Sequence, residues 1–291
     1  MAILGVDIGG TSIKVCKTDK EGNIEVFEEH ESFGKQGAEK LMQRLLGIIS
    51  NFEGVEKIGI STAGQVNHLD GSIIYANDNI PGYTGMQVKS IVQKRFDVPV
   101  KLENDVNAAA LGEKYFGAGK KYPDYLCLTY GTGIGGSIII NSEVYRGNNG
   151  SAGEFGHILT HPFGHLCNCG RRGCYEMYAS TTALIKKTKE IDSRFNNGRS
   201  VFSSYHQGNK HLEKVVIEWV DEIALGIVTL VHIFNPPLIV LGGGIMEQDI
   251  LVKLVSDKVG SMIMDSFKDI QIVKASLGNR AGVLGAVSLF E

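Results

Sequence analysis

The sequence has only six prolines and one tryptophan in 291 residues, and it has no long hydrophobic run. Its most apolar segment, Ala224–Phe234, is too short to cross a bilayer and is followed at once by Pro236 and Pro237. Lys and Arg together number 29 against 32 for Asp and Glu, so neither sign of charge dominates. We therefore expect no nucleic-acid partner and no membrane partner.

Cysteine is also scarce, with five residues, and an odd number cannot be paired completely within one chain. Asp7 and Lys14 interrupt the only early apolar run, which argues against a signal peptide. We therefore expect a cytoplasmic protein, in which thiols stay reduced. Three cysteines fall within the stretch CNCGRRGCYE, at 167–176. A metal site, a disulfide knot and a plain cysteine-rich loop all remain possible there, and reducing conditions disfavour the disulfide.

Glycine, in contrast, is abundant, and two glycine-containing segments resemble each other. ILGVDIGGTSIKVCK (3–17) and LCLTYGTGIGGSIII (126–140) each predict a β-hairpin with Gly and Thr in its turn. Backbone N–H groups in such a turn can bind phosphate, although a tight turn without a ligand explains either segment alone. A β-branched strand follows GTGIGG where a dinucleotide-binding fold requires a helix. The repetition, with a third glycine turn at 242–244, favours a nucleotide-binding protein.

The rest of the chain alternates between strand-like and helix-like patterns. Apolar periodicity predicts helices near Ala38–Ile49 and Leu212–Phe234, and a final helix in AGVLGAVSLF near the C-terminus. Buried strands are expected in KIGISTAG (57–64) and LIVLGGGI (238–245). Alternation of this kind predicts the α/β class.

Asp105 lies where a predicted strand gives way to a helix, and two interpretations are open. It could be an N-cap that accepts from the first helical amides. It could instead be a base that accepts a hydroxyl proton. The two roles are only partly compatible, because a carboxylate occupied by backbone amides is a poorer base.

The cysteine-rich stretch supplies three sulfur ligands, and nearby histidines could supply a nitrogen. One nitrogen and three sulfurs form the ligand set of a closed tetrahedral zinc site, which leaves no position for water or substrate. A structural rather than catalytic zinc is therefore expected. His157, His161 and His165 are the candidates for the nitrogen, and Cys167, Cys169 and Cys174 supply the sulfurs.

Six motifs occur in an order and spacing that resemble the ROK family of sugar kinases over nearly the whole chain. They are DIGGT, GTGIGG, END, GEFGH, CxCGxxGCxE and LGGG. The resemblance implies the actin-like ATPase (RNase-H-like) fold, with two α/β domains and an active-site cleft between them. On this basis the first domain covers 1–118 and is joined by a C-terminal helix at about 279–291. The second domain covers 119–278 and carries ATP-binding loops and the zinc-binding loop.

The resemblance also implies an activity and a role for each matching residue. The expected reaction is ATP- and Mg²⁺-dependent transfer of the γ-phosphate to the 6-hydroxyl of a hexose or N-acetylhexosamine, with Asp105 as general base. Expected sugar-binding residues are Asn79, Asn104, Asp105, Glu154, His157 and Glu176. Expected ATP-binding residues are Asp7, Gly9, Gly10, Thr11, Thr132, Gly133, Gly242, Gly243 and Gly244. The family's histidine ligand is the one in GEFGH, so the resemblance implies a zinc site made of His157, Cys167, Cys169 and Cys174. The family also suggests a homodimer.

Some positions depart from the family pattern and leave the sugar open. Ser12 stands where many members have Lys, with Lys14 two residues later, and Tyr83 and Asn67 replace a common Trp and Asp. Glucose and N-acetylmannosamine are favoured, with fructose, N-acetylglucosamine or a β-glucoside as alternatives. A sugar-sensing regulator is a further alternative, but those proteins carry an added helix-turn-helix domain, for which the sequence before the first hairpin leaves no room.

Overall fold

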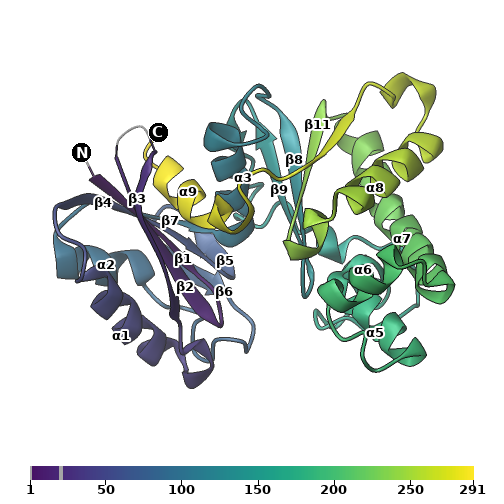
Figure 1. The fold of residues 1–291 in the computed structure, drawn as a ribbon. Helices are drawn as coiled ribbons and strands as arrows, with labels where there is room; N and C mark the ends of the chain where they lie inside the picture. Colours follow the sequence, from purple (N-terminus) through teal and green to yellow (C-terminus); the bar gives the residue numbers. More distant parts are fainter. Residues whose placement is uncertain (1, 20–21) are drawn as a thin grey trace. The chain divides into compact units, whose positions relative to one another are not determined.

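A computed structural model describes residues 2–19 and 22–291. Contacts within the chain divide it into two compact units, each built around a β-sheet (Figure 1). The first unit comprises the chain up to residue 121 together with 143–152 and 279–291. The second unit comprises 122–142 and 153–278. Within the described residues, each helix is either too short or too polar to span a bilayer.

The sheet of the first unit has the strand order β3-β2-β1-β4-β7. Its strands are β1 (Ala2–Ile8), β2 (Ser12–Thr18), β3 (Ile24–Glu31), β4 (Val55–Thr62) and β7 (Val100–Asn104). The short strands β5 (Gln65–Asn67) and β6 (Ser72–Tyr75) pair with each other in a separate sheet, and β10 (Glu143–Val144) lies in the segment 143–152. The helices are α1 (Ala38–Ile49), α2 (Val88–Phe96), α3 (Asp105–Phe116) and α9 (Ala281–Ser288). β1 and β2 form an antiparallel hairpin, whereas β4 and β7 run parallel to β1 and β4 respectively.

Strand β1 shows how the two faces of this sheet differ. Side chains alternate across a strand, and Leu4 and Val6 join the core that includes α1 and α2, whereas Ile3 packs with residues of α9. Gly5 therefore lies on the α9 face, and so does its neighbour across the sheet, Gly59. A Cβ at either glycine would meet a backbone carbonyl of α9. The absence of both side chains lets α9 lie directly on the sheet.

The sheet of the second unit contains the order β9-β8-β11-β12. The strands are β8 (Tyr125–Tyr130), β9 (Ile134–Ile140), β11 (Leu238–Gly242) and β12 (Gln271–Lys274), and the helices are α4 (Glu176–Ala179), α5 (Thr181–Ile191), α6 (Gly198–His206), α7 (Lys210–Phe234) and α8 (Asp249–Met262). Helix α7 begins after the N-cap Asn209 and is followed by the C-cap Asn235, which has φ 44° and directly precedes the two prolines. Its Trp219 is fully buried, and the indole Nε1 donates to the carbonyl of Ser180 (3.1 Å).

Several sequence predictions are confirmed at this level. Both glycine-containing segments form antiparallel hairpins, β1–β2 and β8–β9. Helix α1 has the predicted bounds, and α3 begins at Asp105, where the sequence predicts the change from strand to helix. The predicted final helix is α9. The α/β class is confirmed.

The close contact between α9 and α3 generates a stability prediction. A Cβ at Gly285 would meet the backbone carbonyl of Ala108 in α3, so Gly285→Ala forces two helices apart and should lower stability by about 1–3 kcal/mol. Gly47 in α1 is a matched control, because a Cβ there meets nothing within 4 Å. Gly47→Ala should raise stability by about 0.5–1 kcal/mol. Thermal melts of both variants test this, and a Gly285→Ala protein as stable as wild type would contradict the close packing.

Candidate functional site

The start of α3 is capped by Asn104 and not by Asp105. Asn104 has extended backbone dihedrals (φ −61°, ψ 149°), and its Oδ1 accepts from the N–H groups of Val106 (3.0 Å) and Asn107 (3.2 Å). The N-cap interpretation of Asp105 is therefore wrong. Asn and Asp cap helices about equally well, so the sequence could not show which of the adjacent pair would take the position.

Asp105 is the first residue of α3, with its carboxylate in a desolvated position. Its Oδ1 accepts from the Asn104 side-chain amide (2.9 Å) and from the Val106 N–H (2.9 Å). Burial, and then the nearby charge of Asp7, raise the pKa of Asp105 to about 7, against the opposing effect of these hydrogen bonds. A carboxylate whose pKa lies near neutrality is well matched to accepting a proton at neutral pH.

Asp7 lies on β1 between two neighbours in the sheet. Ser61 on β4 donates a hydrogen bond to Asp7 Oδ1 (2.7 Å), and Lys14 stands opposite on β2. Burial raises the pKa of Asp7, while the Ser61 hydrogen bond and the charge of Lys14 act to lower it. A Cβ at Gly282 in α9 would lie 2.7 Å from the carboxyl carbon of Asp7. Helix α9 therefore covers this carboxylate closely, and Lys14 lies beside it and not in the hairpin turn.

The turn of the β1–β2 hairpin holds the other predicted ATP-binding residues of the first unit. The Gly9 N–H donates to the carbonyl of Ser12 (2.9 Å), which closes the turn around Gly10 and Thr11. The Thr11 carbonyl accepts from the Ser32 N–H (3.0 Å). Gly10 lies against Asn79, whose Cβ would be 3.8 Å from a Cβ at the glycine. The first unit thus brings a predicted phosphate loop and a predicted sugar ligand together.

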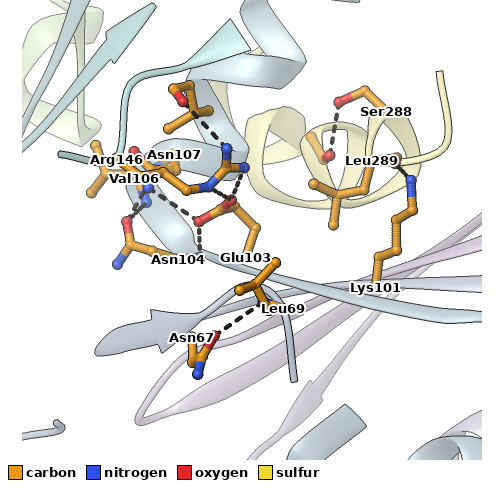
Figure 2. Close-up of polar contacts among 12 residues, drawn as sticks. Asn67, Leu69, Lys101, Glu103, Asn104, Val106, Asn107, Arg146, Ser288 and Leu289 are labelled. Carbon is orange, nitrogen blue, oxygen red and sulfur yellow. Dashed lines mark hydrogen bonds and ion pairs between the residues drawn. The ribbon is translucent and has the colours of Figure 1, made fainter. Parts of the chain in front are cut away.

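Two departures from the family pattern have simple structural accounts. Tyr83 is fully buried, and its hydroxyl lies 2.8 Å from the hydroxyl of Thr62, so it is a core residue. Asn67 stabilises its own turn, because its Oδ1 accepts from the Leu69 N–H (3.1 Å; Figure 2) and its amide donates to Asp70 (2.9 Å).

The second unit brings all four predicted metal ligands together. One ligand atom from each of His157, Cys167, Cys169 and Cys174 lies within 4.8 Å of every other. Cys169 Sγ and Cys174 Sγ are 3.5 Å apart, and Cys167 Sγ is 3.7 Å from His157 Nδ1. Zn–S bonds of about 2.3 Å in a tetrahedron separate two sulfurs by about 3.8 Å, so the set fits zinc. The sulfurs are too far apart for a disulfide, and all five cysteines are free.

The rival histidines have other contacts. In the part of the chain that the structure describes, neither His161 nor His165 joins the ligand group. Both rings stack on Tyr178 instead, with centroid distances of 3.9 Å for His161 and 5.0 Å for His165. His157 is therefore the histidine of this cluster.

The metal ligands and the predicted sugar ligands of this unit are neighbours. While Nδ1 of His157 faces Cys167, its Nε2 lies 3.9 Å from a carboxylate oxygen of Glu154. Glu176 Oε1 lies 3.1 Å from Cys167 Sγ and 3.8 Å from His157 Nδ1. A group bound at the cluster would therefore fix His157 between two carboxylates.

Tyr175 anchors this loop to the core of the unit. It lies between Cys174 and Glu176 in the sequence, and its hydroxyl donates to the carbonyl of Ile223 in α7 (2.7 Å). Because that bond uses its only proton, the Tyr130 hydroxyl donates to Tyr175 across 2.8 Å. Both phenols are buried, so the loop is fixed at this point by a connected pair of hydrogen bonds.

Glu176 also contacts the turn of the β8–β9 hairpin, which holds two predicted ATP-binding residues. Its Oε2 lies 3.4 Å from the Ile134 nitrogen, and it occupies the space that a side chain at Gly133 would need. The carboxylate is mostly buried, with 12% of the side chain exposed. Glu176 thus lies between the metal cluster and the predicted phosphate loop, a connection that the sequence did not reveal.

A pocket of about 660 Å³ opens beside the same hairpin turn. Two predicted ATP-binding residues, Thr132 and Gly244, line it. The other lining residues come from the end of β8, from α5, from the start of α6 and from the turn after β11: Tyr130, Gly131, Thr181, Thr182, Ile185, Lys186, Lys189, Asn196, Asn197, Gly198 and Ile245. Sequence reasoning missed the α5 and α6 residues, because they form no motif and α5 reads as an ordinary amphipathic helix.

Of the three predicted ATP-binding glycines at 242–244, Gly244 alone lines the pocket. Gly242 is the last residue of the strand. Gly243 has φ 96°, and a Cβ there would meet the backbone of Tyr130. Gly242 and Gly243 therefore shape the turn that carries Gly244.

The metal cluster generates a prediction. The purified protein should contain one zinc per chain, and Cys169→Ser should lose it, because a hydroxyl is a poor replacement for a thiolate ligand. The protein should remain folded, since the rest of the unit has its own core, but sugar affinity should fall. Cys127→Ser, at a buried cysteine of β8 outside the cluster, is the control and should keep its zinc. Elemental analysis and sugar titration by calorimetry test this, and normal sugar binding by a zinc-free variant would contradict it.

Comparison with known proteins agrees with the motifs. The model of the ROK family matches residues 3–291. A glucokinase of Thermotoga maritima is 32% identical, covering 100% of this chain and 98% of that protein. The structure of a ROK hexokinase from Thermus thermophilus superimposes with a TM-score of 0.85 at 31% identity, covering 98% of this chain and 96% of that one.

A ROK family glucokinase from Streptomyces griseus, solved with glucose and AMPPNP, gives a TM-score of 0.86 at 31% identity and covers 99% of both chains. The resemblance inferred from the motifs is therefore confirmed. The chain belongs to the ROK family and has its actin-like ATPase fold.

Proposed function

We propose that this ATP-dependent carbohydrate kinase transfers the γ-phosphoryl group of ATP to the 6-hydroxyl of a hexose or N-acetylhexosamine, with Asp105 as general base. The observation that carries the proposal is the state of Asp105. Asn104 is the N-cap of α3, and burial together with the charge of Asp7 raises the pKa of the Asp105 carboxyl to about 7. Glucose is the first candidate substrate because the relatives above are glucokinases and a hexokinase. N-acetylmannosamine is the second.

The proposed step is an in-line displacement. The sugar O6 forms a bond to the γ-phosphorus while the bond from that phosphorus to the β–γ bridging oxygen breaks, and ADP leaves. The carboxylate of Asp105 accepts the proton of the 6-hydroxyl. A base of this kind contributes about 10²- to 10⁴-fold to the rate. Positioning and neutralisation of charge on the phosphates supply most of the remainder.

Asn104 supports this step through Asp105. Its side-chain amide donates to the Gly64 carbonyl (2.9 Å) and to Asp105 Oδ1 (2.9 Å), and its oxygen caps α3. All of its usual hydrogen-bonding positions are therefore occupied. A direct sugar contact by Asn104, as the resemblance implies, would have to replace one of these bonds. We propose that its main role is to orient Asp105.

The proposed sugar-binding residues are Asn79 and Asp105 in the first unit, and Glu154, His157 and Glu176 in the second. Carboxylates suit this task because each can accept hydrogen bonds from two neighbouring hydroxyl groups. Zinc, when bound to the four-ligand cluster, would hold His157 with one ring nitrogen toward the metal and the other toward Glu154. It would fix the recognition surface and take no part in the reaction, because the cluster leaves no open coordination position.

ATP is proposed to use the pocket of the second unit, whose volume is within the range of small-molecule sites. Lys186 and Lys189 add positive charge to the pocket lining, and Thr132 lies at the hairpin turn that would face the phosphates. In the first unit, Asp7 and the turn at Gly9–Thr11 are the proposed phosphate-side residues. Mg²⁺, when bound there, would neutralise phosphate charge, and the Asp7 carboxylate offers the hard oxygen ligands that it prefers.

Fructose, N-acetylglucosamine or a β-glucoside are the alternative substrates, and a sugar-sensing regulator is the alternative class. The raised pKa of Asp105, to which burial and the charge of Asp7 contribute, favours the kinase, because a regulator needs no ionisable base there. A homodimer and a cytoplasmic location complete the proposal, the latter because the cysteine cluster requires reduced thiols.

Replacing the base gives the most specific mutational test. Asp105→Asn keeps the shape of the side chain and leaves the Asn104 cap in place, so the fold should be intact. We expect kcat to fall by about 10²- to 10⁴-fold, with sugar affinity largely retained. Steady-state kinetics and calorimetry measure the two quantities. Turnover close to that of wild type would exclude Asp105 as the base.

The nucleotide pocket can be tested without disturbing the sugar ligands. A Cβ at Gly244 meets nothing within 4 Å, so Gly244→Val projects into the pocket and should raise the KM for ATP far more than the KM for sugar. Gly133 is less suitable, since bulk there would displace Glu176 as well. Gly260→Ala, on α8 with open space around it, is the control and should leave both constants unchanged. An equal rise in both constants for Gly244→Val would argue against this nucleotide site.

A further inference from the structure

Glu103 is a buried carboxylate that immediately precedes Asn104 and Asp105, and the proposed substrate and nucleotide contacts do not use it. Only 3% of its side chain is exposed. Its Oε1 accepts from the Asn104 N–H (2.9 Å) and from the Asn107 side-chain amide (3.1 Å; Figure 2). One oxygen of Glu103 is therefore committed to the first turn of α3.

The other oxygen of Glu103 is held by Arg146. Its Oε2 accepts from Arg146 Nε (3.2 Å) and Arg146 Nη2 (2.6 Å; Figure 2). Arg146 lies 43 residues further along the chain, in the segment 143–152 of the first unit, and its Nη1 donates to the carbonyl of Val144 (3.3 Å). The guanidinium thus ties a separate segment of the chain to the junction between β7 and α3.

These bonds form a continuous path to the proposed base. Arg146 holds Glu103, Glu103 accepts from the backbone of Asn104, and the Asn104 side chain donates to Asp105 Oδ1. Removing the cation from a buried carboxylate strongly destabilises the folded protein, so the Glu103–Arg146 ion pair must stay formed in the native state. A misplacement of about 1 Å at a reacting group can lower a rate by about 10²-fold, so a fixed junction is valuable here.

We propose that the Glu103–Arg146 pair positions the first turn of α3 for phosphoryl transfer. Arg146 is then a positioning residue that contacts neither the sugar nor ATP. The proposal rests on the proposed function of Asp105. The competing interpretation is an ordinary buried ion pair, whose loss lowers stability without changing the rate of the folded enzyme.

The test compares Arg146→Met, Arg146→Lys and the double variant Glu103→Gln/Arg146→Met. Lys101→Met is the matched control, since Lys101 lies on the same strand and donates to the carbonyl of Leu289 at an exposed position (2.6 Å; Figure 2). Kinetic constants are measured well below the lowest melting temperature. Hydrogen exchange is followed at the amides of residues 104–107, with α1 as internal reference.

We expect Arg146→Met to lower kcat by about 10- to 100-fold, with the KM for ATP unchanged, and to speed exchange at residues 104–107. Arg146→Lys should have a higher kcat than Arg146→Met, because lysine keeps the positive charge but lacks the planar guanidinium that donates two hydrogen bonds to Glu103. The double variant should regain melting temperature, because it leaves no buried unpaired charge, but it should not regain kcat. Lys101→Met should leave kcat and exchange as in wild type.

Wild-type kcat and unchanged exchange in Arg146→Met would overturn the proposal, as would recovery of kcat together with melting temperature in the double variant. Failure of the proposed function has a different signature. If Asp105→Asn retains turnover, the base assignment is wrong, whereas the exchange at residues 104–107 in Arg146→Met still reports whether the pair positions this turn.

Discussion

The first unit must keep two like-charged carboxylates, Asp7 and Asp105, close together in a poorly solvated position. Burial opposes the ionisation of both, the charge of Asp7 opposes that of Asp105 further, and each carboxylate has a different set of partners. Asp7 has Ser61 and Lys14, and Asp105 has the Asn104 side chain and a helical N–H. The elements β1, β4 and α3 can lie this close to α9 only because a glycine in one element faces the backbone of the other at each contact. As a result, the pKa of the Asp105 carboxyl lies close to neutral pH.

The second unit solves a different problem, which is to hold polar side chains of a long loop in fixed positions. Tyr175 anchors one end of that loop in the core through its hydroxyl, and the four-ligand cluster gathers the rest. Glu176 then faces the cluster on one side and the β8–β9 turn on the other. The proposed sugar-binding and phosphate-binding residues are therefore adjacent in this unit, and we expect a change at the four-ligand cluster to reach both through the Glu176 carboxylate.

Much of this could be predicted from the sequence where the signal is local. Both hairpins, the start of α3 and the Cys/His cluster follow from short motifs whose geometry depends on neighbours in the chain. The N-cap of α3 could not be assigned from the sequence, because two adjacent residues of END are about equally able to cap a helix. The Glu103–Arg146 pair, the α5 wall of the pocket and the contact of Glu176 with the hairpin turn join distant segments, and no spacing rule encodes such contacts. Tyr83 stood out in the sequence only as a departure from the family pattern, and no local signal showed that its hydroxyl pairs with Thr62 in the core.

Phosphorylation of the 6-hydroxyl of a hexose or N-acetylhexosamine by ATP can be tested directly by sugar-dependent ADP release over a panel of sugars. The product is identified by phosphorus NMR, and 6-deoxyglucose is the control. We expect rapid ADP release with glucose or N-acetylmannosamine, a sugar 6-phosphate as product, and no turnover with 6-deoxyglucose. Phosphorylation at another hydroxyl, or no sugar-dependent ADP release with any member of the panel, would contradict it.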